Sequence, residues 1–354
     1  MAVNDGNLLQ LLLAYSACHR AKLLNHAEPM ARISHYVKGV FSTLETALYQ
    51  SSNPNSNINL ATTIMLASLE VISPSTFHVE ISWHNHLRTS RSIILRRQRD
   101  NPIKRDDLTS YFLMRWFAYL DVLGGLSGGK KAEPPLLHGM YWTTDSDDDY
   151  TVDCLLGFTS RCVSILANVA TLACQCDSER IDTSTDPATI RPEWRPSEET
   201  VAHVERLKKE LEEGRNHQFR GCPHRRSSSQ FDISCDLVLA STNDAFHHAG
   251  LIHLNRRILG KPTNNLEVQH SVKEIVASLS KVRKGGTAEA CLLFPMFTAG
   301  CDAHEEMQRR IVLERVRSVE RSGMVQVKRA RQLIERVWET GMAWETLAQD
   351  QFLG

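Results

Sequence analysis

The stretch FPMFTAGCDAHEEMQRRIV, residues 294–312, places Cys301, Asp302, His304 and Glu305 within five positions of one another. These four residue types supply most of the catalytic and metal-binding groups in proteins, so the stretch raises the question of an active site. An apolar run precedes them and a charged, helix-forming run follows them. The stretch therefore also has the pattern of a corner, at which a buried helix ends and a half-exposed helix begins.

The corner interpretation accounts for each residue without invoking chemistry. Residues 294–297 are aromatic and apolar, and we predict that they lie in the core. Gly300 and Gly323 suit helix ends, because glycine readily adopts the left-handed backbone that ends many helices. Asp302 and Glu305 resemble a capping box at the start of the second helix, where acidic side chains also face the positive helix end. We therefore predict a structural corner with no catalytic residues.

Helical periodicity extends outward from this corner over the whole chain, and strand-like alternation is nearly absent. The pattern predicts an all-α fold, a large antiparallel multi-helix array of about 12 helices. The predicted helices cover residues 7–25, 29–50, 57–72, 77–98, 106–125, 152–177, 197–213, 233–259, 265–281, 287–299, 303–321 and 324–341. We predict one domain over residues 1–354, with mobile loops at about 124–150, 178–197 and 213–230. If a domain boundary exists, residues 178–230 are the natural place for it.

Composition and charge narrow the class of protein. The 354 residues are 42% hydrophobic and 23% charged, which is typical of a soluble globular chain. Lys plus Arg and Asp plus Glu both number 41, so no overall field attracts DNA or an acidic membrane. No apolar run is long enough for a membrane span, and the first residues lack the basic region of a signal peptide. The nine cysteines then favour a reduced, intracellular compartment.

The cysteines and histidines form no recognised metal motif. Structural zinc sites use C-x2-C pairs, and zinc proteases use H-E-x-x-H on one helix. The candidates here have neither spacing; they are Cys174 with Cys176, Cys222 with His224, His247 with His248 and His253, and His84 with His86. Residues two apart on a helix also point in different directions. We therefore predict buried thiols and structural histidines, with no metal-binding or cofactor-binding residues.

Three other segments allow a functional and a structural interpretation. Residues 124–131, GGLSGGKK, match half of a phosphate-binding loop but lack the following Ser or Thr and the preceding strand. Residues 86–99 carry five arginines among apolar residues, so they form either a nucleic-acid or nuclear-import face or the solvated side of an amphipathic helix. We prefer the second. Ser227–Ser229 follow HRR and suit phosphorylation by a basophilic kinase.

Several segments together resemble one protein family. Residues 294–338 resemble the C-terminal signature of the fungal-specific transcription factor domain, in which an apolar-Pro-apolar turn precedes an Arg-bearing helix and a final helix ends in Val-Trp. Further segments resemble the other helices of that domain in the same order; they are residues 11–24, 59–94, 112–128, 153–173 and 245–262. The resemblance covers essentially the whole chain. Within the family, the sequence is similar to regulators of the acriflavine sensitivity control type.

The resemblance implies a nuclear regulatory domain that controls RNA polymerase II transcription of a metabolic or resistance pathway, and no enzymatic activity. Members usually bind zinc and DNA through an N-terminal cluster of six cysteines. Met1 here lies already inside the regulatory domain and that motif is absent. Zinc and DNA are therefore expected only in a missing N-terminal domain. The alternative is a cluster-less module that acts by dimerisation or by binding a co-regulator, without direct DNA binding.

On this basis we expect three kinds of partner: a small-molecule effector, a second copy of the chain, or a co-regulator protein. We expect no membrane partner. An apolar effector pocket among the helices is motivated by a set of aromatic residues, whose alternative role is to pack the core. They are Trp83, Trp116, Phe117, Phe294, Phe297 and Trp338.

Overall fold

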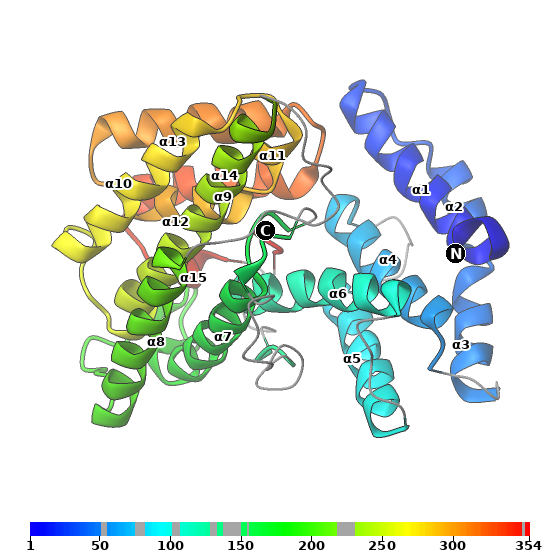
Figure 1. Ribbon diagram of the computed structural model, residues 1–354, viewed down its shortest axis with the longest axis horizontal. Coiled ribbons are helices and arrows are strands. Elements are labelled where there is room, and N and C mark those ends of the chain that lie inside the picture. The colour runs from blue at the N-terminus through cyan, green and yellow to red at the C-terminus, as the bar shows by residue number, and fades with distance from the viewer. Residues whose placement is uncertain are drawn as a thin grey trace. The chain divides into compact units, whose positions relative to one another are not determined.

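The computed structural model describes residues 1–50, 55–74, 82–100, 107–127, 133–136, 150–153, 156–217, 231–348 and 351–354 (Figure 1). Apart from one small hairpin, the regular structure in these ranges is helical, so the all-α prediction is confirmed. The chain forms two compact units, Met1–Asp121 with Glu320–Gln326, and Val122–Val319 with Val327–Gly354. The boundary falls inside α6 (Leu108–Leu126), outside the segment 178–230. None of the described helices combines the length and apolarity needed to cross a membrane.

The first unit is built around the buried helix α4. Its elements are the 3-10 turn η1 (Ala2–Asn4), α1 (Gly6–Leu23), α2 (Met30–Val37), α3 (Val40–Gln50), α4 (Asn57–Ile72), α5 (Trp83–Asp100) and most of α6. Nearly all of α4 is buried, and its Leu66 and Leu69 share one apolar cluster with Leu11 and Ile33. The predicted helix 29–50 is two helices, because the chain leaves regular helix at Lys38 and Gly39.

The second unit contains the longer helices and the hairpin. Its elements are α7 (Ser160–Arg180), β1 (Ile181–Asp182), β2 (Thr189–Ile190), α8 (Glu198–Asn216), α9 (Phe231–His253), the π-helical turn η3 (Leu254–Ile258), α10 (Leu266–Lys281), α11 (Thr287–Ala290), α12 (Leu293–Asp302), α15 (Trp344–Leu347) and most of α13 (Glu306–Glu320) and α14 (Val325–Thr340). Strands β1 and β2 pair antiparallel, with Ile181 opposite Ile190. This hairpin lies where the sequence predicted the loop 178–197. Of the loop predicted at 213–230, residues 213–216 continue α8 and residues 218–230 lie outside the described residues.

Helix α12 is the core of the second unit. All of its residues are buried, and it packs against α9 and α10 (Figure 1). The ring of Phe294 stacks on Phe246 at 6.1 Å, and Phe297 meets Trp344 edge-on at 5.2 Å between centroids. The prediction that residues 294–297 are core is therefore confirmed.

Gly300 does not end this helix, and that prediction is wrong. Residue 300 is helical, and α12 continues to Asp302. A Cβ at Gly300 would lie 2.9 Å from Cδ1 of Ile334 and 3.1 Å from Cγ1 of Val312, so glycine permits a close approach of α13 and α14. Gly323 does end a helix as predicted, because it follows α13 with φ of 80°.

The predicted capping box at Asp302 is also wrong. Ala303 takes an extended backbone, with ψ of 118°, so the chain leaves α12 before α13 begins at Glu306. The N-terminal contact of α13 instead comes from Gln308, whose Oε1 accepts from the backbone N–H of Glu305 at 3.4 Å. The side chain of Asp302 turns into the protein and is 4% exposed.

Candidate functional site

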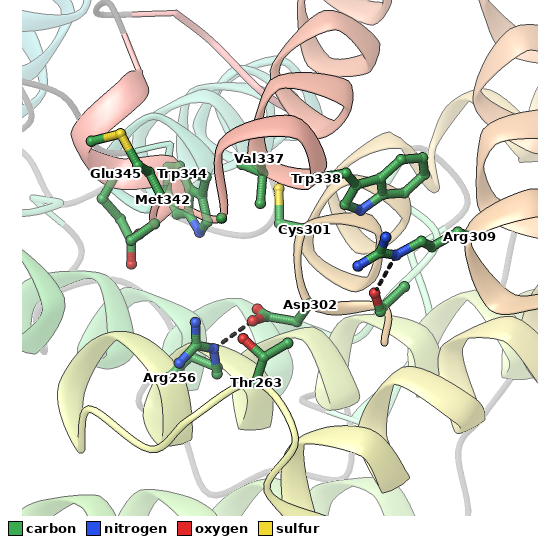
Figure 2. A pocket seen from close by; sticks show the side chains of 13 residues that line it. Arg256, Thr263, Cys301, Asp302, Arg309, Val337, Trp338, Met342, Trp344 and Glu345 are labelled. Carbon is green, nitrogen blue, oxygen red and sulfur yellow. Dashed lines mark hydrogen bonds and ion pairs between the residues drawn. The ribbon is translucent and has the colours of Figure 1, made fainter. Parts of the chain in front are cut away.

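A charged pocket of about 120 Å³ opens at the C-terminal end of α12 (Figure 2). Guanidinium, carboxylate, thiol and indole groups face it, and they come from η3, α12, α13, α14 and α15. The lining residues are Arg256, Thr263, Cys301–Ala303, Arg309, Val337–Trp338 and Gly341–Glu345.

The chain reaches the pocket through a turn after α14. Gly341 ends that helix with φ of 68°, a left-handed conformation that side chains other than glycine rarely adopt. The indole Nε1 of Trp338 donates to the carbonyl oxygen of Gly300 at 2.8 Å. The guanidinium of Arg309 lies 5.2 Å from the centre of the Trp338 ring, and its Nε donates to the carbonyl of Ala303. These contacts hold one wall of the pocket against the end of α12.

Arg256 and Asp302 form the polar floor of the pocket (Figure 2). Nε of Arg256 donates to Oδ1 of Asp302, and its Nη1 donates to the carbonyl of Lys261. The amide nitrogen of Gln269 donates to the backbone carbonyl of Asp302 at 2.8 Å. That bond satisfies one of the carbonyl groups that a helix leaves unpaired at its C-terminal end.

The π-helical turn presents its two adjacent arginines to different partners. Arg257 is 1% exposed; its Nη2 lies 2.6 Å from Oδ2 of Asp177, and its Nη1 donates to the carbonyl of Leu126 at 2.9 Å. Arg180 lies between Oδ1 of Asp177 at 2.8 Å and Oε1 of Glu345 at 3.0 Å. Single π-helical turns occur often at functional sites, where they redirect side chains.

Three arginines and three carboxylates therefore form ion pairs beside the pocket, which together we call the ionic network. Arg180 and Arg257 share Asp177, and Arg180 also pairs with Glu345. The pair of Arg256 and Asp302 stands apart from these four residues. The members of the network are Arg180, Arg256, Arg257, Asp177, Asp302 and Glu345. The charges balance when all six groups are ionised. Buried charges are tolerated only when they are paired in this way, because each one loses its hydration.

Burial and pairing move the pKa values of this network in different directions. Burial raises the pKa of Asp302 to about 6, although the charge of Arg256 acts the other way. Burial also acts to raise the pKa of Glu345, but the charges of Arg180 and Arg257 outweigh it, and the pKa lies below its ordinary value. Asp302 thus changes its charge nearer to neutral pH than Glu345 does.

Cys301 does not have the character of a nucleophile. Burial and the charges of Asp302 and Glu345 raise the pKa of its thiol well above the ordinary value. The reactive and metal-binding form of cysteine is the thiolate, so Cys301 is an uncharged wall of the pocket at neutral pH. The lining groups suit recognition of a polar molecule.

The structure separates the cluster that opens the sequence argument. Cys301 and Asp302 lie in the pocket, whereas His304 and Glu305 are exposed. The aromatic set is also divided: Trp338 lines the pocket, Phe294 and Phe297 pack the core of the second unit, and Trp83, Trp116 and Phe117 belong to the first unit.

Most of the remaining histidine and cysteine candidates have structural surroundings. Nδ1 of His247 contacts the carbonyl of Asn243 at 2.7 Å, and His253 stacks on Phe294. His84 contacts Ser82, and His86 stacks on Phe41. Cys176 is buried, which raises its pKa to about 11. Sγ of Cys174 lies 3.7 Å from the carbonyl of Gly125. Lys130, Cys222, His224 and Ser227–Ser229 lie outside the described residues.

The basic stretch 86–99 has the amphipathic pattern in α5. Leu87, Ile93 and Ile94 are buried, whereas other positions of the helix, Arg88 and Arg99 among them, are exposed. Arginines of this helix have partners within the first unit: Arg91 pairs with Asp121 at 2.6 Å, Arg97 donates to Ser110 at 2.8 Å, and Arg88 donates to Asn85 at 3.2 Å.

Sequence reasoning missed most of the ionic network. The sequence pattern assigns no role to Arg256, Arg257, Arg180, Asp177 or Glu345. The available signal was a pair of adjacent arginines between the apolar residues Leu254 and Ile258, since charges buried there need partners.

Comparison with known families identifies the family of the chain. The family described as "Fungal specific transcription factor domain" matches residues 1–343, so the chain belongs to that family and has a role in fungal transcription regulation. No curated protein and no solved structure matches the chain. The narrower likeness to regulators of the acriflavine sensitivity control type stays a prediction.

Proposed function

We propose that this chain is the regulatory domain of a fungal transcription factor of the zinc-cluster type. It acts in the nucleus on RNA polymerase II transcription of a metabolic or resistance pathway. The observation that carries the proposal is the family match over residues 1–343. In this proposal a domain outside this chain binds zinc and DNA, and this chain acts through binding and without turnover.

The pocket at the end of α12 is the proposed effector site. Its volume of about 120 Å³ is small beside drug-binding pockets, which measure about 300–1,000 Å³. It suits a small polar molecule or the polar end of a larger one, held by Arg256, Arg309 and the two indoles. An effector regulates only if it binds two conformations of the protein with different affinities. The ion pair of Arg180 and Glu345 connects the pocket to α7 and α15, so these helices are the elements that an effector would shift.

A reporter assay tests this function. The chain is fused to a DNA-binding module foreign to a fungal host, and transcription from the matching promoter is compared with that of the module alone. We expect a change of several-fold. Asp302→Asn should alter that output at equal protein level, whereas Lys209→Ala, at a side chain 77% exposed, should leave it unchanged.

Two outcomes separate the parts of the proposal. An unchanged reporter with the fusion present in the nucleus rejects the regulatory function. A changed reporter that is indifferent to Asp302→Asn keeps the regulatory function and rejects the pocket as its control point.

Exposed leucines on α1 favour the second candidate function, a dimerisation or co-regulator module. Leu9, Leu12 and Leu13 lie on one side of the helix and are 45%, 41% and 43% exposed. Light scattering of the purified chain tests the homodimer form. A dimer that becomes monomeric in the Leu9→Ser, Leu12→Ser double variant supports it, and a strict monomer for the unaltered chain rejects it.

A further inference from the structure

The seam between α9 and α10 carries polar residues at matching steps. Asp244 and His248 lie one turn apart on α9, and His270, Glu274 and Ser278 follow one another at four-residue steps on α10. Ser278 contacts Asp244 at 3.3 Å, and the ring of His270 meets that of His248 edge-on at 5.9 Å between centroids. The order of these contacts shows that the two helices run antiparallel.

Three potential ligand atoms converge at this seam. One atom each from Asp244, His248 and Glu274 lies within 4.8 Å of the other two. Zinc bonds to nitrogen and oxygen measure about 2.0–2.2 Å, which separates tetrahedral ligands by about 3.3–3.6 Å. The three atoms thus need to approach by about 1 Å or somewhat more, a movement that side-chain rotation supplies. His270 is exposed and stands near enough to become a fourth ligand.

A cation of the protein already faces these groups. Nη1 of Arg215, near the end of α8, lies 2.9 Å from Nε2 of His248, and its Nε lies 4.0 Å from Oδ1 of Asp244. A guanidinium only donates, so Nε2 of His248 accepts and its lone pair faces the seam. The Nε of Arg215 is buried without a hydrogen-bond partner, so the guanidinium is not fully satisfied by Asp244 and His248.

The charge and protonation of the seam suit a divalent cation. His248 is 1% exposed, and its Nε2 accepts from Arg215 at 2.9 Å, so this nitrogen carries no proton and has a lone pair able to bind metal. Asp244 and Glu274 supply two negative charges. One imidazole with two carboxylates, and a second imidazole beside them, is a ligand set for zinc and neighbouring transition metals.

We propose that Asp244, His248, Glu274 and His270 form a divalent transition-metal site between α9 and α10, from which bound metal displaces Arg215. Metal at this site joins two helices and releases the end of α8. Because the metal binds the folded chain and not the unfolded one, it also stabilises the fold. The site is separate from the proposed effector pocket and does not depend on the proposed function.

Zinc titration of the purified full chain, after treatment with a chelator, tests the site. Calorimetry should give one zinc ion per chain, and zinc should raise the melting temperature. His270→Ala and Glu274→Gln alter partly or fully exposed side chains, and each should weaken zinc binding by about tenfold or more. His35→Ala changes an exposed histidine of the first unit and should leave the affinity unchanged.

Arg215→Met gives the sharpest result, because it removes the competing cation and should strengthen zinc binding by about tenfold. Adventitious binding to surface histidines predicts no effect of Arg215→Met. The proposal is overturned by the absence of stoichiometric zinc binding, by unchanged affinity in both ligand variants, or by an Arg215→Met variant that binds zinc no better than the unaltered chain.

Discussion

The carboxylate of Glu345 lies 3.0 Å from the guanidinium of Arg180, although 165 residues separate the two in the chain. Both side chains are almost fully buried, at 5% and 3% exposed. The pair joins the short C-terminal helix α15 to the end of α7 beside the pocket. A buried ion pair therefore holds distant segments of the second unit together, in addition to apolar packing.

Breaking this pair should cost more stability than any surface ion pair. Arg180→Met leaves the carboxylate of Glu345 buried without its ion-pair partner, which costs about 3–5 kcal/mol in urea unfolding. Glu345→Gln should cost less, about 1–3 kcal/mol, because Arg180 keeps Asp177 at 2.8 Å. The double variant should be more stable than the sum of the two losses predicts. The exposed Lys209→Ala control should change stability by less than about 0.5 kcal/mol, and an equally small effect of Glu345→Gln contradicts the prediction.

Asp302 should give the fold a pH dependence of unusual sign. Its pKa is about 6 in the folded chain against an ordinary 3.8, so the folded state binds the proton more tightly than the unfolded state. Its contribution is greatest at low pH and is lost as pH rises from about 4 to about 6, by about 3 kcal/mol in total.

The measurement compares unfolding free energies of the unaltered chain and Asp302→Asn between pH 4 and pH 8. The buried histidines titrate in both proteins, so their contributions cancel in the difference. The difference should change over the range from pH 4 to pH 6 and level off above it. A difference that stays constant across the range shows that Asp302 does not titrate there.

Gly300→Ala should destabilise the second unit although alanine is the better helix former by about 1 kcal/mol. The added Cβ meets Ile334 and Val312, and overpacking of this kind costs about 1–3 kcal/mol. Gly6→Ala is the matched control, because a Cβ there has no neighbour within 4 Å. Thermal unfolding of both variants decides the matter, and equal melting temperatures for the two argue against the close approach.

The indole N–H of Trp338 should contribute measurably to stability. Trp338→Phe leaves the carbonyl of Gly300 without its 2.8 Å donor, at a cost of about 1–3 kcal/mol. Trp194→Phe is the matched control, since the indole N–H of Trp194 is buried without a partner and its removal orphans no acceptor. Denaturant unfolding should rank the Trp338 variant as clearly the less stable, and the reverse ranking contradicts this role.

The sequence by itself determined the helical elements and the apolar character of α12. Both follow from local periodicity, which depends on neighbours within a turn or two of helix. The end of α13 at Gly323 was equally accessible, because glycine conformation is a local property.

Only the tertiary structure decided what the polar residues do. Asp302 has the spacing of a cap, but its partner Arg256 lies 46 residues away and its side chain is buried. A glycine such as Gly300 is typical of a helix end, but here glycine is needed because Ile334 and Val312 leave no room for a Cβ. The proposed metal site depends on the register of α9 against α10, which brings Glu274 to His248. Such relations arise from packing between distant segments, where burial makes an unpaired charge too costly to keep, and no local pattern records which partner will be found.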